Sequence, residues 1–373
     1  MITPAVNRQR VNAQVLKVLA VKAKAVKSSS WVKVAALPGL IALWLLVGFA
    51  AMAAHPLGEQ SQGKSPGVRW DMPTPYGDAT HHSRNLRAFA QDVAQTSGNE
   101  LQIVLHTGAS LFKHNELPRA VRSRLVPIVE VFGGLLGNED PLFKLDNLPF
   151  LATDFDAAHD LYLASKPEME AALAQQGLML LFSVPWPPQG LYSQQPVNDL
   201  ADFKGARMRA YSPVTSRLAL LLASQPTTVQ TVEIPQAFST GMIEMMITSP
   251  TTGVSSQSWD YVSHYTDIQA WLPRNLVLVN RQAFERLSPK AQQALLAAAA
   301  QAEARGWQWA QQETLEKTAQ LAAQGMQVSP PSPALMQGLK QTGEVMTLEW
   351  LQEAGARGEA VLERYRQRRS HQP

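Results

Sequence analysis

From residue 68 onward, the apolar positions of the chain follow two alternating spacings. Short runs with the spacing of a β-strand occur at 68–72, 101–107 and 126–134, separated by segments with helical spacing at 82–98 and 116–125. Strands that alternate with helices are typical of a parallel sheet covered by helices. This stretch therefore predicts a first α/β lobe in the order βαβαβ.

A second set of strands and helices follows, and it predicts a second α/β lobe. We place lobe I at 68–183, with later segments crossing back to it, and lobe II mainly at 184–287. The strand-like runs of the second set are 178–184, 190–193, 206–211, 227–232 and 243–249, with helical spacing at 214–225 and 234–241. The predicted fold class is α/β, with two lobes.

The segment 288–325 predicts a long helix that bridges the two lobes. Between Pro289 and Gln324 there is no internal proline and one glycine, Gly306. Ser288 is a suitable N-cap, and Glu313 and Lys317 are spaced for an i,i+4 ion pair. At 1.5 Å per residue the helix would be roughly 54 Å long, more than one lobe can cover. The alternative is a kink at Gly306 that gives two helices packed on one lobe.

The remaining segment, 326–373, predicts a C-terminal helix and a basic tail. The amphipathic spacing runs from Pro333 to about Arg366, and the sequence ends in RYRQRRSHQP. We expect this tail to be frayed and solvated. On the long bridging helix we also expect Leu296 and Leu315 to be buried.

Charge is distributed unevenly along the chain. Residues 1–58 contain seven Lys or Arg and no Asp or Glu, which leaves 26 basic against 30 acidic residues in the body. A mildly acidic body argues against a nucleic-acid partner, which needs clustered basic residues. The basic stretch precedes an apolar run that ends near Ala51-Met52-Ala53, the pattern of an export signal.

We therefore expect 1–53 to be a signal peptide or an N-terminal membrane anchor, followed by a Gly/Ser-rich linker at 54–67. Alternatively, the true start of the protein lies further in. Cleaved or retained, a segment with a positive flank places the body outside the cytoplasm, in the periplasm.

Several kinds of chemistry have no support in the sequence. The chain has no cysteine, so disulfides, thiolate metal sites and cysteine nucleophiles are excluded. No Gly-x-Ser-x-Gly elbow, phosphate loop or dinucleotide fingerprint occurs. The four histidines that could suggest a metal lack the spacing of a known zinc motif, so we expect neither metal nor cofactor; they are His81, His82, His106 and His114.

Two arginines in the segment GARMRAYSP stand out as candidate binding residues. Arg207 and Arg209 point to the same face of one predicted strand, and Arg209 is nearer its carboxyl end, the edge where ligands bind in open α/β sheets. Ser212-Pro213 then begins a helix, whose N-terminus favours anions. A guanidinium there suits a carboxylate ligand. The alternative is an internal ion pair with an Asp or Glu.

The body of the sequence resembles the solute-binding proteins of tripartite ATP-independent periplasmic (TRAP) transporters, the DctP-type family. The resemblance spans about 68–330. It implies a two-lobed α/β clamshell, like that of periplasmic binding proteins, with a long helix that spans both lobes. The most specific match is DFKGARMRAYSP, and others are WDMPTPYGDATHHSRNLRAFAQDV, DPLFKLDNLPFLATDFDAAHDLY, VPWPPQGLYS, IPQAFSTGMIEMMITSP and WDYVSHYTDIQAWLPRNLVLVN.

The resemblance also implies site residues in the second lobe. Arg209 falls on the family's carboxylate-binding arginine, whereas Arg207 falls on a variable position that we assign to solvent. Thr248 and Ser249 end a strand where the family places a polar residue in the cleft. Tyr211, just after the arginine strand, completes the candidates of this lobe.

In the first lobe, the resemblance points to Tyr76, His82 and Glu130 as residues that line the cleft. Trp186, close to the crossover between lobes, is expected to wall the pocket. Related sequences often have glycine before the glutamate, whereas this chain has Val129, which bears on the orientation of Glu130.

The resemblance implies a receptor and not an enzyme. It would bind a small organic acid and deliver it to the small and large integral membrane subunits of a TRAP permease. One alternative is a membrane-anchored periplasmic sensor or interaction protein with the same clamshell, and another is an enzyme using Glu130 and His82 as acid and base. Some relatives pair through a C-terminal helix, so residues 333–366 are a candidate for a homodimer.

Overall fold

The computed structural model describes residues 67–370, all of which belong to one compact unit of the chain. The predicted export segment and nearly all of the predicted linker lie outside the described residues. No helix in the described part of the chain has the length and apolar character needed to cross a membrane.

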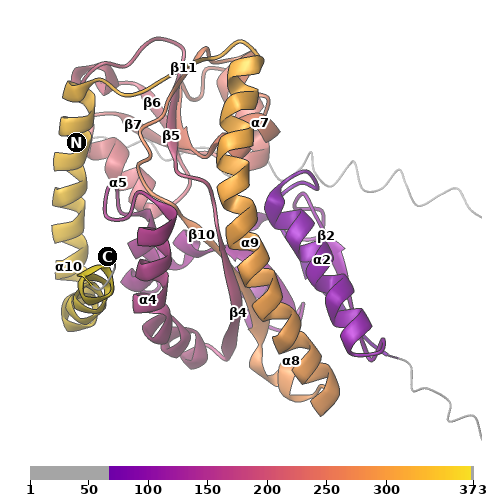
Figure 1. Cartoon of the computed structure of the whole chain (residues 1–373). Helices are drawn as coiled ribbons and strands as arrows, with labels where there is room; N and C mark the ends of the chain where they lie inside the picture. The colour runs from indigo at the N-terminus through magenta and orange to yellow at the C-terminus, as the bar shows by residue number, and fades with distance from the viewer. Residues whose placement is uncertain (1–66, 371–373) are drawn as a thin grey trace, which may run out of the picture. The chain divides into compact units, whose positions relative to one another are not determined.

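Helices and strands alternate through most of this unit, as the sequence predicts (Figure 1). The strands are β1 (Val68–Pro73), β2 (Leu101–His106), β3 (Ile128–Phe132), β4 (Leu178–Pro185), β5 (Gly190–Ser193), β6 (Arg207–Ala210), β7 (Gln225–Thr228), β8 (Met245–Thr248), β9 (His264–Thr266), β10 (Arg274–Asn280) and β11 (Gln327–Ser329). The α-helices are α2 (His81–Thr96), α3 (Leu117–Arg122), α4 (Phe155–Gln175), α5 (Pro213–Leu221), α6 (Ile234–Ser239), α7 (Pro250–Ser255), α8 (Arg281–Glu285), α9 (Pro289–Ala323) and α10 (Pro333–Ser370).

The first lobe contains two small sheets, one more than the predicted βαβαβ order implies. Strands β1 and β2 pair in parallel, as expected, but β3 pairs antiparallel with β10 in a sheet of order β3-β10-β4. The expectation of one parallel sheet was therefore wrong at β3. Every residue of β10 is buried, so this strand, which follows the second lobe in sequence, completes the first lobe.

The second lobe is a six-stranded sheet of order β11-β9-β5-β8-β6-β7. Strands β6 and β8 run in parallel side by side, so their carboxyl ends meet at the same edge of the sheet. That edge brings Arg209 and Tyr211, at the end of β6, near Thr248 and Ser249, at the end of β8.

Helix α9 is continuous and contacts both lobes, α2 and β4 on one side and α7 and β11 on the other (Figure 1). The alternative of a kink at Gly306 was wrong. A Cβ atom on Gly306 would lie 2.5 Å from Cγ2 of Val184. The glycine therefore lets the helix pass close over β4.

Three expectations about side chains on α9 were wrong. Glu313 is buried and pairs with Arg84 of α2, so it does not form the predicted pair with Lys317. Leu296 and Leu315 are exposed, at 47% and 77%. The apolar stripe facing the lobes consists instead mainly of alanines, which allow close approach of the helix.

The C-terminal helix is longer than predicted and contains a kink that the sequence analysis did not predict. Helix α10 extends to Ser370 and has one non-helical residue, Gly355, with φ 57° and ψ −145°. The tail is not frayed or merely solvated within this range, because Arg364 and Arg368 form ion pairs with carboxylates of α4, Glu168 and Asp160. Helix α4 itself was not predicted from the sequence.

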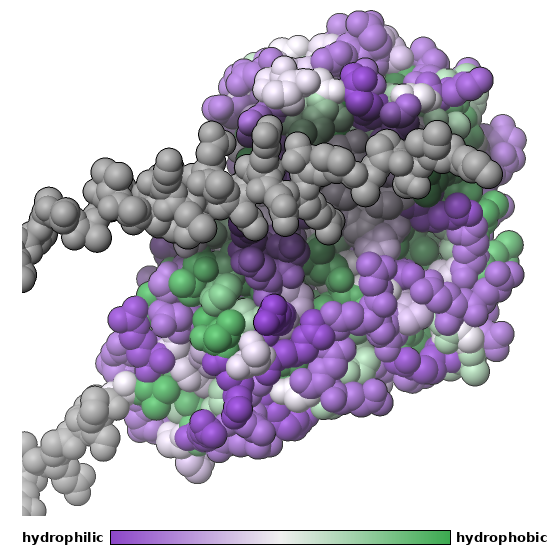
Figure 2. Space-filling model, turned by 180° about the vertical axis from the view of Figure 1, so that it is seen from behind, coloured by the Kyte–Doolittle hydropathy of each residue, from purple (hydrophilic) through white to green (hydrophobic). Residues whose placement is uncertain are grey.

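On the visible part of the face in Figure 2, hydrophilic residues predominate and apolar residues occur in small groups between them. Scattered apolar residues of this kind are normal for a protein surface.

Candidate functional site

A cavity lies between the two lobes, at the carboxyl edge of β6 and β8. It encloses about 370 Å³ of empty space, including its open mouth. The first lobe and the connecting segments contribute the side chains of Tyr76, His114, Phe132, Trp186, Gln189 and Pro273, and the second lobe those of Arg209, Tyr211, Gln230, Thr231, Thr248, Ser249 and Thr252. Six of the eight predicted site residues therefore line one cavity. The other two, His82 and Glu130, do not.

Arg209 is the charged group of this cavity. Its side chain is 3% exposed, and its Nε donates to the carbonyl oxygen of Val229 at 3.0 Å. No Asp or Glu within residues 67–370 forms an ion pair with Arg209. The described residues therefore do not support the alternative of an internal ion pair. Burial lowers the pKa of Arg209 to about 10, which leaves the guanidinium charged at neutral pH.

The aromatic ring of Tyr211 contacts the guanidinium of Arg209. The central carbon of the Arg209 guanidinium lies 4.7 Å from the centroid of the Tyr211 ring, a distance typical of cation–π contacts. The Tyr211 hydroxyl donates to Oε1 of Gln189 at 3.2 Å. These contacts leave the terminal nitrogens of the guanidinium available to a ligand. Arg207, at the start of the strand, is exposed and pairs with Glu244 at 2.6 Å.

Ser212 and Ser249 cap the helices that follow β6 and β8. The Ser212 hydroxyl accepts from the backbone N–H of Thr215 at 3.2 Å, and that of Ser249 from the N–H of Thr252 at 3.1 Å. Because the Ser249 hydroxyl also donates to Oγ1 of Thr252 at 3.1 Å, Thr248, the last residue of β8, is the freer donor of the two. Its side chain is buried and lines the cavity.

Aromatic rings and one asparagine form the wall on the first-lobe side. The indole N–H of Trp186 donates to Oδ1 of Asn275 at 2.9 Å, and the Tyr76 hydroxyl donates to the same oxygen at 3.4 Å. The two rings pack edge to face at an interplanar angle of 67°, with centroids 4.8 Å apart. Asn275 was missed from the sequence. The only signal for it was a polar residue within the apolar strand RNLVLVN.

His82 and Glu130 form a buried pair behind this wall. The Nδ1 of His82 lies 3.2 Å from Oε1 of Glu130, and the Thr74 hydroxyl donates to Oε2 at 2.5 Å. Burial acts to raise the pKa of Glu130, but the hydrogen bonds and charge of its partners outweigh it and lower that pKa. The His82 ring packs 4.2 Å from that of Trp186, so the pair supports the cavity wall from outside the cavity.

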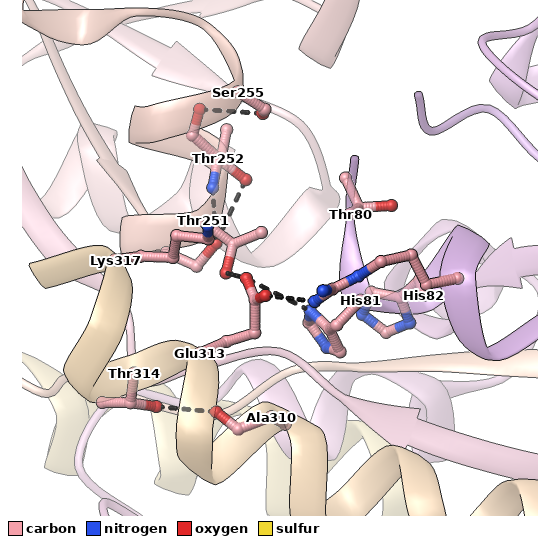
Figure 3. A network of polar contacts seen from close by, with 12 residues as sticks. Thr80, His81, His82, Thr251, Thr252, Ser255, Ala310, Glu313, Thr314 and Lys317 are labelled. Atoms are coloured by element: carbon pink, nitrogen blue, oxygen red, sulfur yellow. Dashed lines mark hydrogen bonds and ion pairs between the residues drawn. The ribbon is translucent and has the colours of Figure 1, made fainter. Parts of the chain in front are cut away.

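A second buried carboxylate lies where the lobes meet helix α9. Figure 3 shows Glu313 of α9 pointing toward His81 of α2 and Thr251 of α7. Its Oε1 lies 2.5 Å from Arg84, and its Oε2 accepts from the Thr251 hydroxyl at 3.0 Å and lies 4.0 Å from Nδ1 of His81. Burial lowers the pKa of His81 well below its usual range, so its ring is neutral at pH 7. One carboxylate thus links a helix from each lobe.

Sequence reasoning missed other lining residues, including Gln189, Gln230 and His114. His114 had been considered only as a metal ligand. No group of three or more His, Asp or Glu residues within 67–370 is arranged to hold a metal ion. Three of the four histidines considered hydrogen-bond to protein groups: His81 to the carbonyl oxygen of Pro185, His106 to Asp71 and His114 to Gln230.

Comparisons with known proteins identify a matching family and similar structures. Residues 76–353 match the family model DctP, described as bacterial extracellular solute-binding protein, family 7. The DctP6 structure from Bordetella pertussis, an extracytoplasmic solute receptor binding pyroglutamic acid, is 45% identical, with a TM-score of 0.80 over 80% of this chain and 100% of that one. A marine metagenome TRAP solute-binding protein specific for pyroglutamate is 38% identical, with a TM-score of 0.79 over 81% of this chain and 99% of that one.

Curated relatives are more distant. The 2,3-diketo-L-gulonate-binding periplasmic protein YiaO of Escherichia coli K12 is 25% identical over 264 residues, 69% of this chain and 77% of that protein. A solute-binding protein of Albidiferax ferrireducens is 23% identical over 220 residues, and the match spans 57% of this chain and 64% of that protein. The family match covers most of the chain, and the solved structures share its two-lobed fold. The chain therefore belongs to the DctP family of bacterial extracellular solute-binding proteins, whose members are substrate-binding receptors and not enzymes.

Proposed function

We propose that this protein is the extracytoplasmic receptor of a TRAP-type transporter and that it binds a small cyclic carboxylate, pyroglutamate, between its lobes. The observation that carries the proposal is the charged guanidinium of Arg209, which is buried at an inter-lobe cavity and has no carboxylate partner within residues 67–370. An unpaired buried charge is unfavourable by itself, so an arginine in this position favours an anionic ligand.

The size and composition of the cavity support a small acid. Its empty space of about 370 Å³ includes the open mouth, so the enclosed part has room only for a small ligand. Gln189, Thr248 and Tyr211 supply neutral polar groups that suit the lactam N–H and C=O, and Tyr76 and Trp186 exclude water from the ring. Two relatives at 45% and 38% identity bind pyroglutamate, which supports the same ligand here.

In this proposal, binding shifts the protein from an open to a closed form. A ligand that contacts both lobes favours the closed form by its differential affinity for the two. The closed receptor then delivers the acid to the small and large integral membrane subunits of the permease. We place the receptor in the periplasm, as the family description implies.

The test is calorimetry and thermal unfolding of the purified protein with pyroglutamate, proline and glutamate. Proline lacks the lactam carbonyl, and glutamate lacks the ring. We expect pyroglutamate alone to bind tightly, and at 100 times its Kd to raise the free energy of unfolding by about 2.7 kcal/mol. Failure of pyroglutamate and of a wider library of small acids to bind would overturn the proposal.

A further inference from the structure

A second pocket lies directly outside the ligand cavity. It encloses about 760 Å³ of empty space, including its mouth, and four of its nine lining residues are exposed. It shares three lining residues with the ligand cavity, and these separate the two spaces: His114, Gln230 and Thr231. This second pocket, the outer pocket, therefore adjoins the ligand cavity along these residues.

The separating residues come from opposite lobes. His114 follows β2 of the first lobe, and Gln230 follows β7 of the second. The Nδ1 of His114 donates to Oε1 of Gln230 at 3.2 Å, which is a direct hydrogen bond across the cleft. The edge of the His114 ring also packs on Tyr76, with centroids 5.6 Å apart, and on Phe132, with centroids 6.4 Å apart. These contacts hold the ring over the mouth of the cavity.

We propose that His114 and Gln230 form a gate that seals the ligand cavity and sets how long the acid stays bound. The inference rests on the proposed function. Because the hydrogen bond joins the two lobes, it exists only when they have closed, and it stabilises the closed form without touching Arg209. Escape of the acid into the outer pocket requires that this bond break. The gate therefore acts on dissociation and leaves capture unchanged.

The test is stopped-flow fluorescence with pyroglutamate on the full chain, comparing wild type with His114→Ala, Gln230→Ala and the double variant. A neutral hydrogen bond stabilises by about 0.5–1.5 kcal/mol, so each single change should raise the dissociation rate constant roughly three- to tenfold. The association rate constant should stay within about twofold. The double variant should dissociate no faster than the faster single variant, because both changes remove one contact.

The matched controls remove a histidine and a glutamine that lie away from the cleft. His264→Ala, on β9, and Gln312→Ala, on the exposed face of α9, should leave both rate constants unchanged. If His114→Ala fails to fold, the dissociation rate constant of Gln230→Ala alone tests the gate. The Gln230 side chain is only part-buried, so its removal should not prevent folding. His114→Asn retains an N–H donor and should recover part of the slow dissociation.

The outcomes separate the gate from the proposed function. If wild type binds pyroglutamate but both single variants dissociate at its rate, or if their effects add in the double variant, the gate is overturned and the proposed function stands. If wild type binds no pyroglutamate, the proposed ligand is overturned and the gate falls with it.

Discussion

The Nδ1 atom of His82 lies 3.2 Å from Oε1 of Glu130, and both side chains are buried behind the indole of Trp186. This pair lies outside the ligand cavity, although both residues were predicted to line it. The position of the pair indicates that it holds the aromatic wall in place. Substitutions can therefore test separately the residues that bind the ligand and the residues that support the cavity wall.

Glu130→Gln should lower the free energy of unfolding by about 1–3 kcal/mol at pH 7, because a buried charged acceptor is lost. The pKa of Glu130 is lowered below its ordinary value of 4.5, so the folded form binds a proton less readily than the unfolded chain. Its stabilising contribution is therefore complete above pH 4.5 and is lost as pH falls further. Urea unfolding between pH 7 and 3 should show a shallower decline for the variant. Parallel curves for the two proteins would contradict this.

Arg209→Ala should weaken pyroglutamate binding at least about a hundredfold, because two charge-assisted hydrogen bonds are lost. The unliganded variant should be as stable as wild type or more stable, since a buried charge without a carboxylate partner is removed. Calorimetry measures the first effect and thermal unfolding the second. Arg207→Ala is the matched control, because Arg207 pairs with Glu244 at the exposed end of the same strand. If Arg209→Ala kept the wild-type affinity for pyroglutamate, the assignment of Arg209 as the carboxylate-binding residue would be wrong.

Glu313→Gln should destabilise the protein by about 1–3 kcal/mol, because the carboxylate that links α2, α7 and α9 loses its charge. Chemical unfolding at pH 7 measures the change. Glu316→Gln removes an exposed carboxylate three residues further along α9 and should change stability by less than about 0.5 kcal/mol. Equal effects of the two substitutions would show that the buried link is unimportant.

Gly306→Ala should be destabilising, although alanine favours a helix over glycine by about 1 kcal/mol. The added Cβ would lie 2.5 Å from Cγ2 and 2.9 Å from Cγ1 of Val184, and overpacking of this kind costs about 1–3 kcal/mol. Val184→Ala in the same chain should relieve the clash, so a double-mutant cycle should give a favourable coupling. A stabilised single variant would mean that α9 can move away from β4.

His114 should make stability depend on pH in a weakly acidic range. Burial lowers its pKa from 6.5 to about 4, so the unfolded chain takes up a proton first as pH falls. The contribution of neutral His114 to the free energy of unfolding is therefore complete above pH 6.5 and is lost progressively between pH 6.5 and about 4. Urea unfolding at pH 7, 6, 5 and 4 should show a smaller loss for His114→Asn. His264→Asn, which changes a histidine away from the cleft, serves as the control.

Several features could be predicted because they depend on neighbours in sequence. Helix α9 follows from a long run without proline between Ser288 and Gly325, and the edge position of Arg209 follows from strand alternation and the Ser212-Pro213 cap. Alternation and capping act over a few residues, so the order of residues is sufficient to reveal them.

Other features depended on which distant residues pack together. The sequence placed Glu313 beside Lys317, but the fold buried it against Arg84, because two helices cross there. The sequence left open a kink at Gly306 as an alternative, whereas in the fold this glycine allows the close approach of β4. Likewise, His114 and Gln230 lie 116 positions apart, and only the packing of the two lobes brings them together. The sequence determined most of the elements and the candidate anion site. The tertiary structure decided which residues line the cavity, support it and close it, because burial and pairing arise only where separate elements meet.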